Sequence, residues 1–147
     1  MADINEYVVF EIENEYYGID IKLVENIEKP KAITRVPYTK DFIEGVVNLR
    51  GNIIPVLYLR KRFDIDHKEM DEDSRIIIIN YKDYNVGLIV DSSSEVVQLK
   101  NSKIENAPKI KDDKKLNYVK EVGKDNERII MLLDMKKVLD VKEKKDE

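Results

Sequence analysis

Apolar and polar residues alternate in short runs at the start of the chain. Residues 8–12 alternate in this way, and residues 17–21 do so again after the polar pair Asn14-Glu15. Because successive side chains of a strand point to opposite faces, each run predicts a half-buried strand. Two such strands joined by a short polar turn predict a hairpin.

A second hairpin is expected further along the first half. Residues 45–50 and 53–59 have strand character, and Gly51-Asn52 between them predicts a type II′ turn, because glycine accepts the positive φ of the first central position. Residues 60–63 then predict a single helical turn.

The segment between these hairpins has a weaker pattern. Residues 23–27 have apolar spacing compatible with a helical turn, and Pro30 and Pro37 bound a short strand at residues 33–36.

The second half repeats this order of elements. Residues 92–94 are three serines and are expected to form a turn. Strands are expected at residues 75–81, 86–91, 95–99, 118–122 and 128–133, and a terminal helix at residues 135–139.

The two halves correspond to each other at a separation of 69 residues. The matched pairs are Gly18 with Gly87, Phe10 with Ile79, and Ile27 with Val96. Each half has about five short strands and no helix long enough for a βαβ crossover. The pattern therefore predicts an all-β fold of two packed five-stranded barrels with a short C-terminal helix. Residues 76–79 are apolar on both faces, so that strand is expected to be buried between the barrels.

We expect one domain with two subdomains. The boundaries suggested by the repeat are approximately residues 14–72 and residues 73–141, with the N-terminal strand at residues 6–13 packed against the second subdomain. Residues 142–147 are charged throughout and are expected to be a disordered tail.

Composition removes most familiar chemistries. The chain of 147 residues has no cysteine, one histidine and five scattered glycines, so thiol chemistry, a multi-histidine metal site and a glycine-rich phosphate loop are all excluded. The net charge of −4 argues against a nucleic-acid partner. The longest apolar runs fall far short of the about 20 residues of a membrane span. We therefore expect a cytoplasmic protein that binds no cofactor or metal and does not insert into a membrane.

The alternative is a small enzyme or ligand-binding barrel that uses His67. This base lies in the acidic linker at residues 64–73, but Ile65 and Met70 are the only apolar neighbours that could desolvate it. A solvated surface histidine is the simpler interpretation. The linker also lacks the glycine that a twelve-residue calcium loop needs.

A set of motifs resembles the CheW family of chemotaxis coupling proteins. The strongest is Asn48-Leu49-Arg50-Gly51, which stands between a Gly-Val strand and the sequence Ile53-Ile54-Pro55-Val56. The matching residues elsewhere are Tyr17 to Ile21, Thr34 to Pro37, Val86 to Asp91, Ala107-Pro108 and Arg128 to Leu133.

The resemblance implies two SH3-like five-stranded barrels and a non-enzymatic adaptor. Such an adaptor bridges a CheA-type histidine kinase, through its regulatory domain, to the cytoplasmic tips of methyl-accepting chemotaxis receptors, in arrays at the inner face of the membrane. A kinase or a CheV-type protein would need a further catalytic or receiver domain, for which 147 residues leave no room.

The family also implies a set of receptor- or kinase-binding positions. Arg50 matches the arginine of the family turn, and a guanidinium there can contact a carboxylate of a partner. The chain departs from the family at Asn26, where many relatives have glutamate, and at Ser92, where glycine is common. The implied positions are Val24, Asn26, Ile27, Asn48, Leu49, Arg50, Gly51, Val86 and Asp91.

Overall fold

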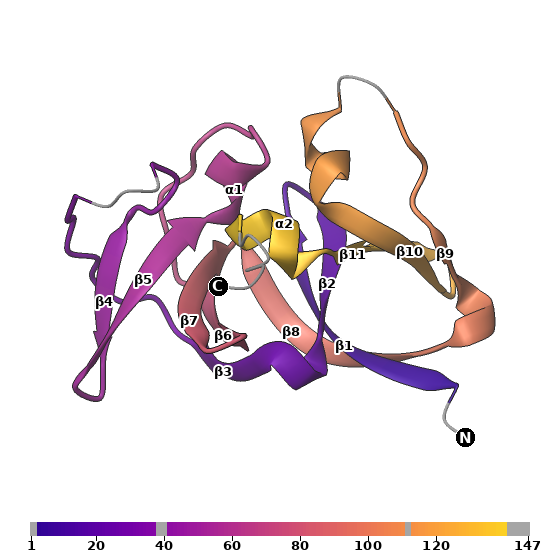
Figure 1. Ribbon diagram of the computed structural model, residues 1–147, viewed down its shortest axis with the longest axis horizontal. Helices are drawn as coiled ribbons and strands as arrows, with labels where there is room; N and C mark the ends of the chain where they lie inside the picture. Colours follow the sequence, from indigo (N-terminus) through magenta and orange to yellow (C-terminus); the bar gives the residue numbers. More distant parts are fainter. Residues whose placement is uncertain (1–2, 38–40, 111–112, 141–147) are drawn as a thin grey trace, which may run out of the picture.

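A computed structural model describes residues 3–37, 41–110 and 113–140 of the chain (Figure 1). Its strands are β1 (Ile4–Ile12), β2 (Glu15–Asp20), β3 (Val24–Glu28), β4 (Gly45–Leu49), β5 (Asn52–Tyr58), β6 (Arg75–Tyr81), β7 (Tyr84–Val90), β8 (Ser92–Lys100), β9 (Ile104–Asn106), β10 (Val119–Asp125) and β11 (Arg128–Leu133). Its helices are α1 (Leu59–Arg62) and α2 (Met135–Leu139), with 3₁₀ turns η1 (Ile21–Leu23), η2 (Asn101–Lys103) and η3 (Lys114–Tyr118).

The strands form two curved sheets that lie side by side, with α2 between them (Figure 1). The five-stranded sheet has the order β3-β6-β7-β5-β4, and the six-stranded sheet has the order β8-β1-β2-β11-β10-β9. The predicted all-β class with two subdomains and a short C-terminal helix is confirmed. One sheet has six strands because the three-residue β9 is added at its edge.

The two sequence repeats exchange their first hairpins. Hairpin β1–β2 pairs with β8 and β11 of the second repeat, and hairpin β6–β7 pairs with β3 and β5 of the first repeat. The expected boundary near residue 72 therefore separates the repeats but not the sheets. Strands β6 and β7 follow this boundary, yet they belong to the sheet of β3 to β5. Residues 6–13 were expected to pack against the second subdomain, and both strands of the first hairpin join the six-stranded sheet. Periodicity identifies strands, whereas this pairing depends on contacts distant in sequence.

Two glycines make the exchange possible. Gly18 in β2 lies beside β11 in a parallel pairing, and Gly87 in β7 lies beside β5 in the same way. A Cβ atom on Gly87 would be 2.8 Å from both Ile76 Cγ2 and Val56 Cγ1. The parallel strands can therefore approach only where a side chain is absent.

The hydrophobic core has three parts. The largest lies between the sheets and includes Phe10, Tyr17, Leu59 and Phe63, while a smaller cluster lies inside each curved sheet. Residues 76–79 are at most 1% exposed, with alternate side chains in the inter-sheet core and in the interior of the five-stranded sheet. Their predicted burial on both faces is confirmed.

Several local predictions are wrong. The turn between β4 and β5 is centred on Arg50-Gly51, with φ of 51° and 87°, which is the φ pattern of a type I′ turn and not a type II′ turn at Gly51-Asn52. Residues 92–94 lie in β8 and form no turn. Residues 33–36 contribute only an isolated bridge from Thr34 to Val46.

The segment at residues 23–27 is mostly β3, preceded by the 3₁₀ turn η1. The charged tail at residues 142–147 lies outside the described residues.

Replacing Gly87 with alanine should lower the free energy of unfolding by about 1–3 kcal/mol, because the new methyl group meets the stiff β-branched side chains Val56 and Ile76. Gly18→Ala is the matched control and should cost less, because its contact at 2.9 Å is with the flexible end of Leu132 and the β-branched Ile130 is further away, at 3.2 Å. Urea denaturation of both variants measures the difference. An unchanged midpoint for Gly87→Ala would contradict the prediction.

Candidate partner-binding surface

The only histidine lies on the surface and lacks the surroundings of a catalytic base. The His67 imidazole is half-exposed, 3.0 Å from the Glu69 carboxylate and edge-on to the ring of Tyr58. Across the part of the chain that the structure describes, no three His, Cys, Asp or Glu side chains are arranged to hold a metal ion. These contacts describe a surface imidazole that lies between a carboxylate and an aromatic ring.

The turn between β4 and β5 holds four of the sequence-predicted residues in distinct roles. Leu49 is buried in the interior of the five-stranded sheet and anchors the turn. The Asn48 side chain accepts a hydrogen bond of 2.9 Å from the Gly51 amide, which stabilises the tight backbone. The Arg50 side chain is 67% exposed and approaches Glu28 at 3.4 Å. The turn therefore presents one guanidinium to solvent while its neighbours fix the backbone.

Strand β3 brings three more predicted residues to the edge of the same sheet. Ile27 lies opposite Ile77 and Val24 lies opposite Ile79, so both side chains are on the face that turns toward the inter-sheet core. Val24 packs against that core, whereas Ile27 is 44% exposed. Asn26 is exposed on the opposite face.

The pair Arg50–Glu28 joins the end of β3 to the β4–β5 turn. We call the surface of the two segments that this pair joins the hairpin-tip surface; its residues are Ile27, Glu28, Asn48, Arg50, Gly51 and Ile53. Ile53 was not predicted from the sequence, yet it is 62% exposed, the most exposed of the large hydrophobic side chains in the described residues. Strand alternation could have indicated this exposure: Ile53 lies next to the buried Ile54, so its side chain is on the opposite face of β5, where a polar residue is expected.

Two predicted residues lie elsewhere. Val86 is 8% exposed and packs in the inter-sheet core, across Ile79 from Val24. Asp91 follows β7 and makes internal contacts: its oxygens accept hydrogen bonds of 2.9 and 2.6 Å from Arg60, and one also accepts from the Glu13 amide at 2.9 Å. Neither belongs to the hairpin-tip surface.

Electrostatics at Asp91 reflect these contacts. Burial acts to raise the pKa of Asp91, but the hydrogen bonds from Arg60 and the Glu13 amide outweigh it and hold the pKa below its ordinary value. A lowered pKa means that the native state favours the ionised carboxylate. Asp91 therefore stabilises the fold only while it is charged.

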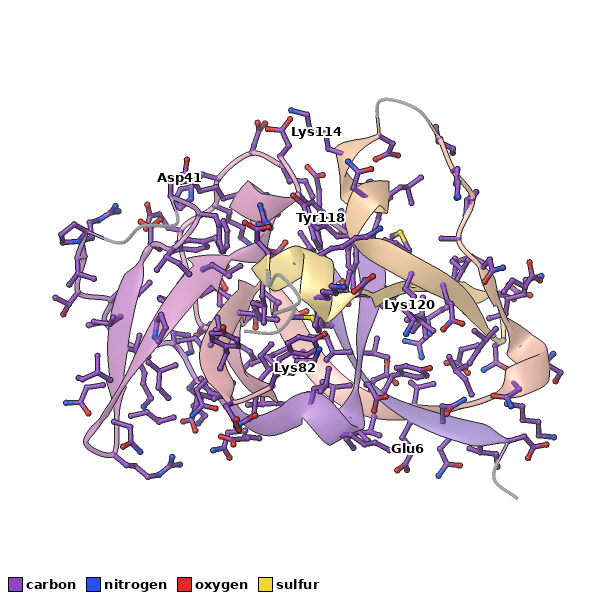
Figure 2. The ribbon with its side chains drawn as sticks, viewed as in Figure 1. Glu6, Asp41, Lys82, Lys114, Tyr118 and Lys120 are labelled. Carbon is purple, nitrogen blue, oxygen red and sulfur yellow. The ribbon has the colours of Figure 1, made fainter. Side chains whose placement is uncertain are left out.

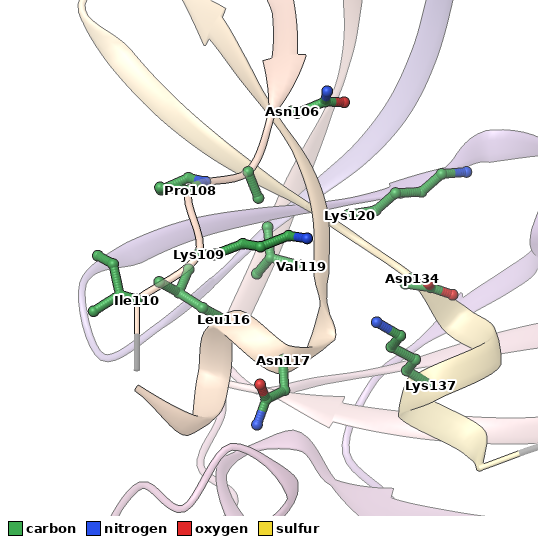
Figure 3. Close-up of a pocket in the computed structure, with 11 residues that line it drawn as sticks. Asn106, Pro108, Lys109, Ile110, Leu116, Asn117, Val119, Lys120, Asp134 and Lys137 are labelled. Carbon is green, nitrogen blue, oxygen red and sulfur yellow. The ribbon is translucent and has the colours of Figure 1, made fainter. Parts of the chain in front are cut away.

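A cleft of about 620 Å³ opens on the other sheet (Figure 3). Its apolar lining includes Ala107, Pro108, Leu116 and Val119, and its charged lining is Lys109, Lys120, Lys137 and one carboxylate, Asp134. Figure 3 shows Lys109 reaching across the cleft toward Val119, while Lys120 points away. Ammonium groups around an apolar lining complement an acidic and partly apolar surface. Of the motifs noted in the sequence, Ala107-Pro108 lies here.

Known proteins resemble this chain over nearly its whole length. Residues 6–143 match the CheW-like domain family. The chain is 38% identical to a chemotaxis protein CheW of Bacillus subtilis over 90% of its length and 85% of that protein. It is 37% identical to a chemotaxis protein CheW of Klebsiella aerogenes over 94% of its length and 83% of that protein.

A solved structure has the same fold. The scaffolding protein TtCheW from Thermoanaerobacter tengcongensis superimposes with a TM-score of 0.84 at 37% identity, and the match covers 95% of each chain.

The stability contributed by Asp91 should depend on pH. The pKa in the unfolded chain is close to 4, so the contribution is complete above that value and is lost as the pH falls through the lower native pKa. Asp91→Asn should lower the urea midpoint at neutral pH, and the gap to the parent should narrow as the pH falls below the unfolded-chain pKa of about 4. A gap independent of pH would contradict this account.

Proposed function

Because the chain belongs to the CheW-like domain family, we propose that it is a chemotaxis adaptor that couples a CheA-type histidine kinase to the cytoplasmic tips of methyl-accepting chemotaxis receptors. The match to the family extends over residues 6–143 and includes both sheets. Its work is protein–protein contact, which needs exposed surface and no reactive side chain.

The observation that carries the proposal is the hairpin-tip surface. Arg50 has a left-handed backbone, a conformation that costs a non-glycine residue roughly 1–2 kcal/mol. Glu13 and Lys82 also have positive φ in turns, so strain alone does not distinguish Arg50. The difference is its surroundings: the Arg50 guanidinium is 3.4 Å from Glu28, and the exposed Ile27 and Ile53 belong to the two segments that this contact joins. An exposed arginine and exposed large apolar side chains on neighbouring segments are typical of a protein-binding site.

Glu28 accounts for a departure from the family. Asn26 occupies a position where many relatives have glutamate, but Glu28 lies two residues further along β3 on the same face. Its carboxylate is 3.4 Å from the Arg50 guanidinium. In this chain Glu28 supplies the negative charge beside Arg50, and a partner carboxylate would share or displace that contact.

The lysine-rimmed cleft supports a second contact on the other sheet. Lys109 and Lys137 would attract an acidic segment, while Leu116 and Val119 would receive its apolar side chains. Two separate surfaces are what an adaptor between two partners requires. Each contact is expected to be modest, and multivalency in a receptor array would strengthen it.

The adaptor would work in the cytoplasm, associated with receptor arrays. Among the described residues, no helix is long and apolar enough to cross a membrane. An enzyme centred on His67 is the alternative, and the exposed contacts of that side chain with Glu69 and Tyr58 do not favour it.

Arg50→Gly should separate stability from binding. Glycine relieves the left-handed strain but increases the freedom of the unfolded chain, so the free energy of unfolding should change by no more than about 1 kcal/mol. Arg50→Ala keeps the strain and should be less stable than Arg50→Gly. Both variants should bind the partners at least about tenfold more weakly, as expected for a central arginine. Isothermal titration with receptor-tip and kinase fragments tests this, and wild-type affinities for both partners would remove Arg50 from the site.

Ile27→Lys tests the apolar part of the hairpin-tip surface. A lysine at this 44% exposed position should be tolerated by the fold, but it would bring an unpaired charge into the contact and should abolish co-sedimentation with receptor fragments and kinase. Ile4→Lys is the matched control, because Ile4 is 47% exposed on β1 of the other sheet. Equal binding by both variants would count against the surface. Failure of the parent chain to bind either partner would overturn the proposed function.

A further inference from the structure

Helix α1 stands between the two sheets and has side chains that reach both. It follows β5 of the five-stranded sheet and has only four residues, Leu59–Arg62. Leu59 is fully buried in the inter-sheet core, and Phe63, directly after the helix, stacks against Tyr17 and Tyr118. These apolar contacts anchor the helix and leave Arg60 and Arg62 to make polar ones.

Arg60 connects α1 to the first hairpin of the six-stranded sheet through Asp91. Its guanidinium donates two hydrogen bonds to Asp91, of 2.9 and 2.6 Å, and a third of 2.8 Å to the carbonyl of Asp66. Asp91 in turn accepts from the amide of Glu13 in the β1–β2 turn, and its own amide donates to the carbonyl of Glu11. The Arg60 and Asp91 side chains are only 12% and 17% exposed. The Arg60–Asp91 pair is therefore a partly buried, bidentate contact beyond the ends of β5 and β7, and it holds Asp91 where it binds the β1–β2 hairpin of the other sheet.

Arg62 joins the same helix to α2 at the end of the six-stranded sheet. Its guanidinium donates 2.7 and 3.1 Å hydrogen bonds to the carbonyls of Val138 and Lys137, which belong to the last turn of α2. It also lies 4.0 Å from the centre of the Phe42 ring and 4.9 Å from that of Tyr118. Phe42 precedes β4, whereas Tyr118 ends η3 beside α2, in the middle of the molecule (Figure 2). One guanidinium thus caps a helix and contacts a ring from each subdomain.

Directional contacts of this kind restrict orientation in a way that the apolar core does not. Burial of hydrophobic surface depends on area and has little dependence on angle, whereas a bidentate hydrogen bond restricts both distance and angle. Another ion pair between the sheets, Lys114 with Asp64, has side chains that are 69% and 70% exposed, so it contributes little.

We propose that Arg60 and Arg62 are positioning residues that fix the orientation of the two sheets, and thereby hold the two partner-binding surfaces of the adaptor in one geometry without touching a partner. The consequence for binding rests on the proposed function, but the consequence for orientation does not. Lys61 lies between the two arginines on the same helix and donates to the carbonyl of Asp41, before β4 of the same subdomain, so it serves as the control.

The first test measures the geometry directly and needs no partner. The chain has no cysteine, so Tyr84→Cys and Ser102→Cys place one spin label on each subdomain at exposed positions. Pulsed electron spin resonance should give a narrow distance distribution for the labelled parent and for Lys61→Met. Arg60→Met and Arg62→Met should shift or broaden this distance distribution. If the methionine variants fold poorly, Arg60→Lys and Arg62→Lys replace them and should cause a smaller change in the same direction. An unchanged distribution in every arginine variant that folds overturns the proposal.

The second test asks whether the orientation matters for coupling. With a CheA-type kinase and a soluble receptor-tip fragment, Arg60→Met and Arg62→Met should change each separate dissociation constant by less than about threefold, whereas formation of the three-component complex should fall at least about tenfold. A mutation that merely unfolds the protein would weaken all three measurements together. Normal three-component assembly despite a shifted distance overturns the functional part. Failure of the parent to bind either partner removes the proposed function and leaves the result on orientation in place.

Discussion

The reciprocal exchange of two hairpins is the constraint on which the rest of the structure depends. Each repeat gives its first hairpin to the sheet of the other, and the parallel pairings that close the exchange need Gly18 and Gly87 at the contact. Neither sheet is complete without strands from both halves of the chain. Residues 76–79 are apolar on both faces for the same reason, because β6 lies between the interior of its own sheet and the core that both sheets share.

This arrangement also explains what could be predicted from the sequence and what could not. Strand positions follow from local alternation, so the all-β class, the repeat and the short terminal helix were accessible. The assignment of residues 75–90 to the first sheet was not, because it depends on pairing between strands distant in sequence. The turn at Arg50-Gly51 was misplaced by one residue. A glycine in the sequence indicates a residue with positive φ, but it does not reveal that the preceding residue, Arg50, also has positive φ.

At the candidate surface, too, the sequence identified residues but not their surroundings in the fold. Arg50 and Ile27 were implied by their match to family motifs, and both side chains are exposed. Asp91 came from the same kind of argument, yet its carboxylate is occupied by Arg60 and the Glu13 amide. A family motif identifies a residue that matters, but it does not show whether that residue touches a partner or stabilises the fold. Ile53 shows the converse, because an exposed isoleucine is indistinguishable from a core residue until its face of the strand is known.

The same distinction bears on how a protein of this kind can act with no reactive group. An adaptor contributes the relative position of its partners, so the groups that hold its own parts in position belong to its mechanism as much as the groups that touch a partner. Helix α1 concentrates these groups in few residues: Leu59 lies in the core, Arg60 holds Asp91 against the β1–β2 turn, and Arg62 is bonded to the end of α2. Because the exchanged hairpins prevent the sheets from separating, these contacts need only restrict their rotation, which is the task for which hydrogen-bonded guanidinium groups are suited.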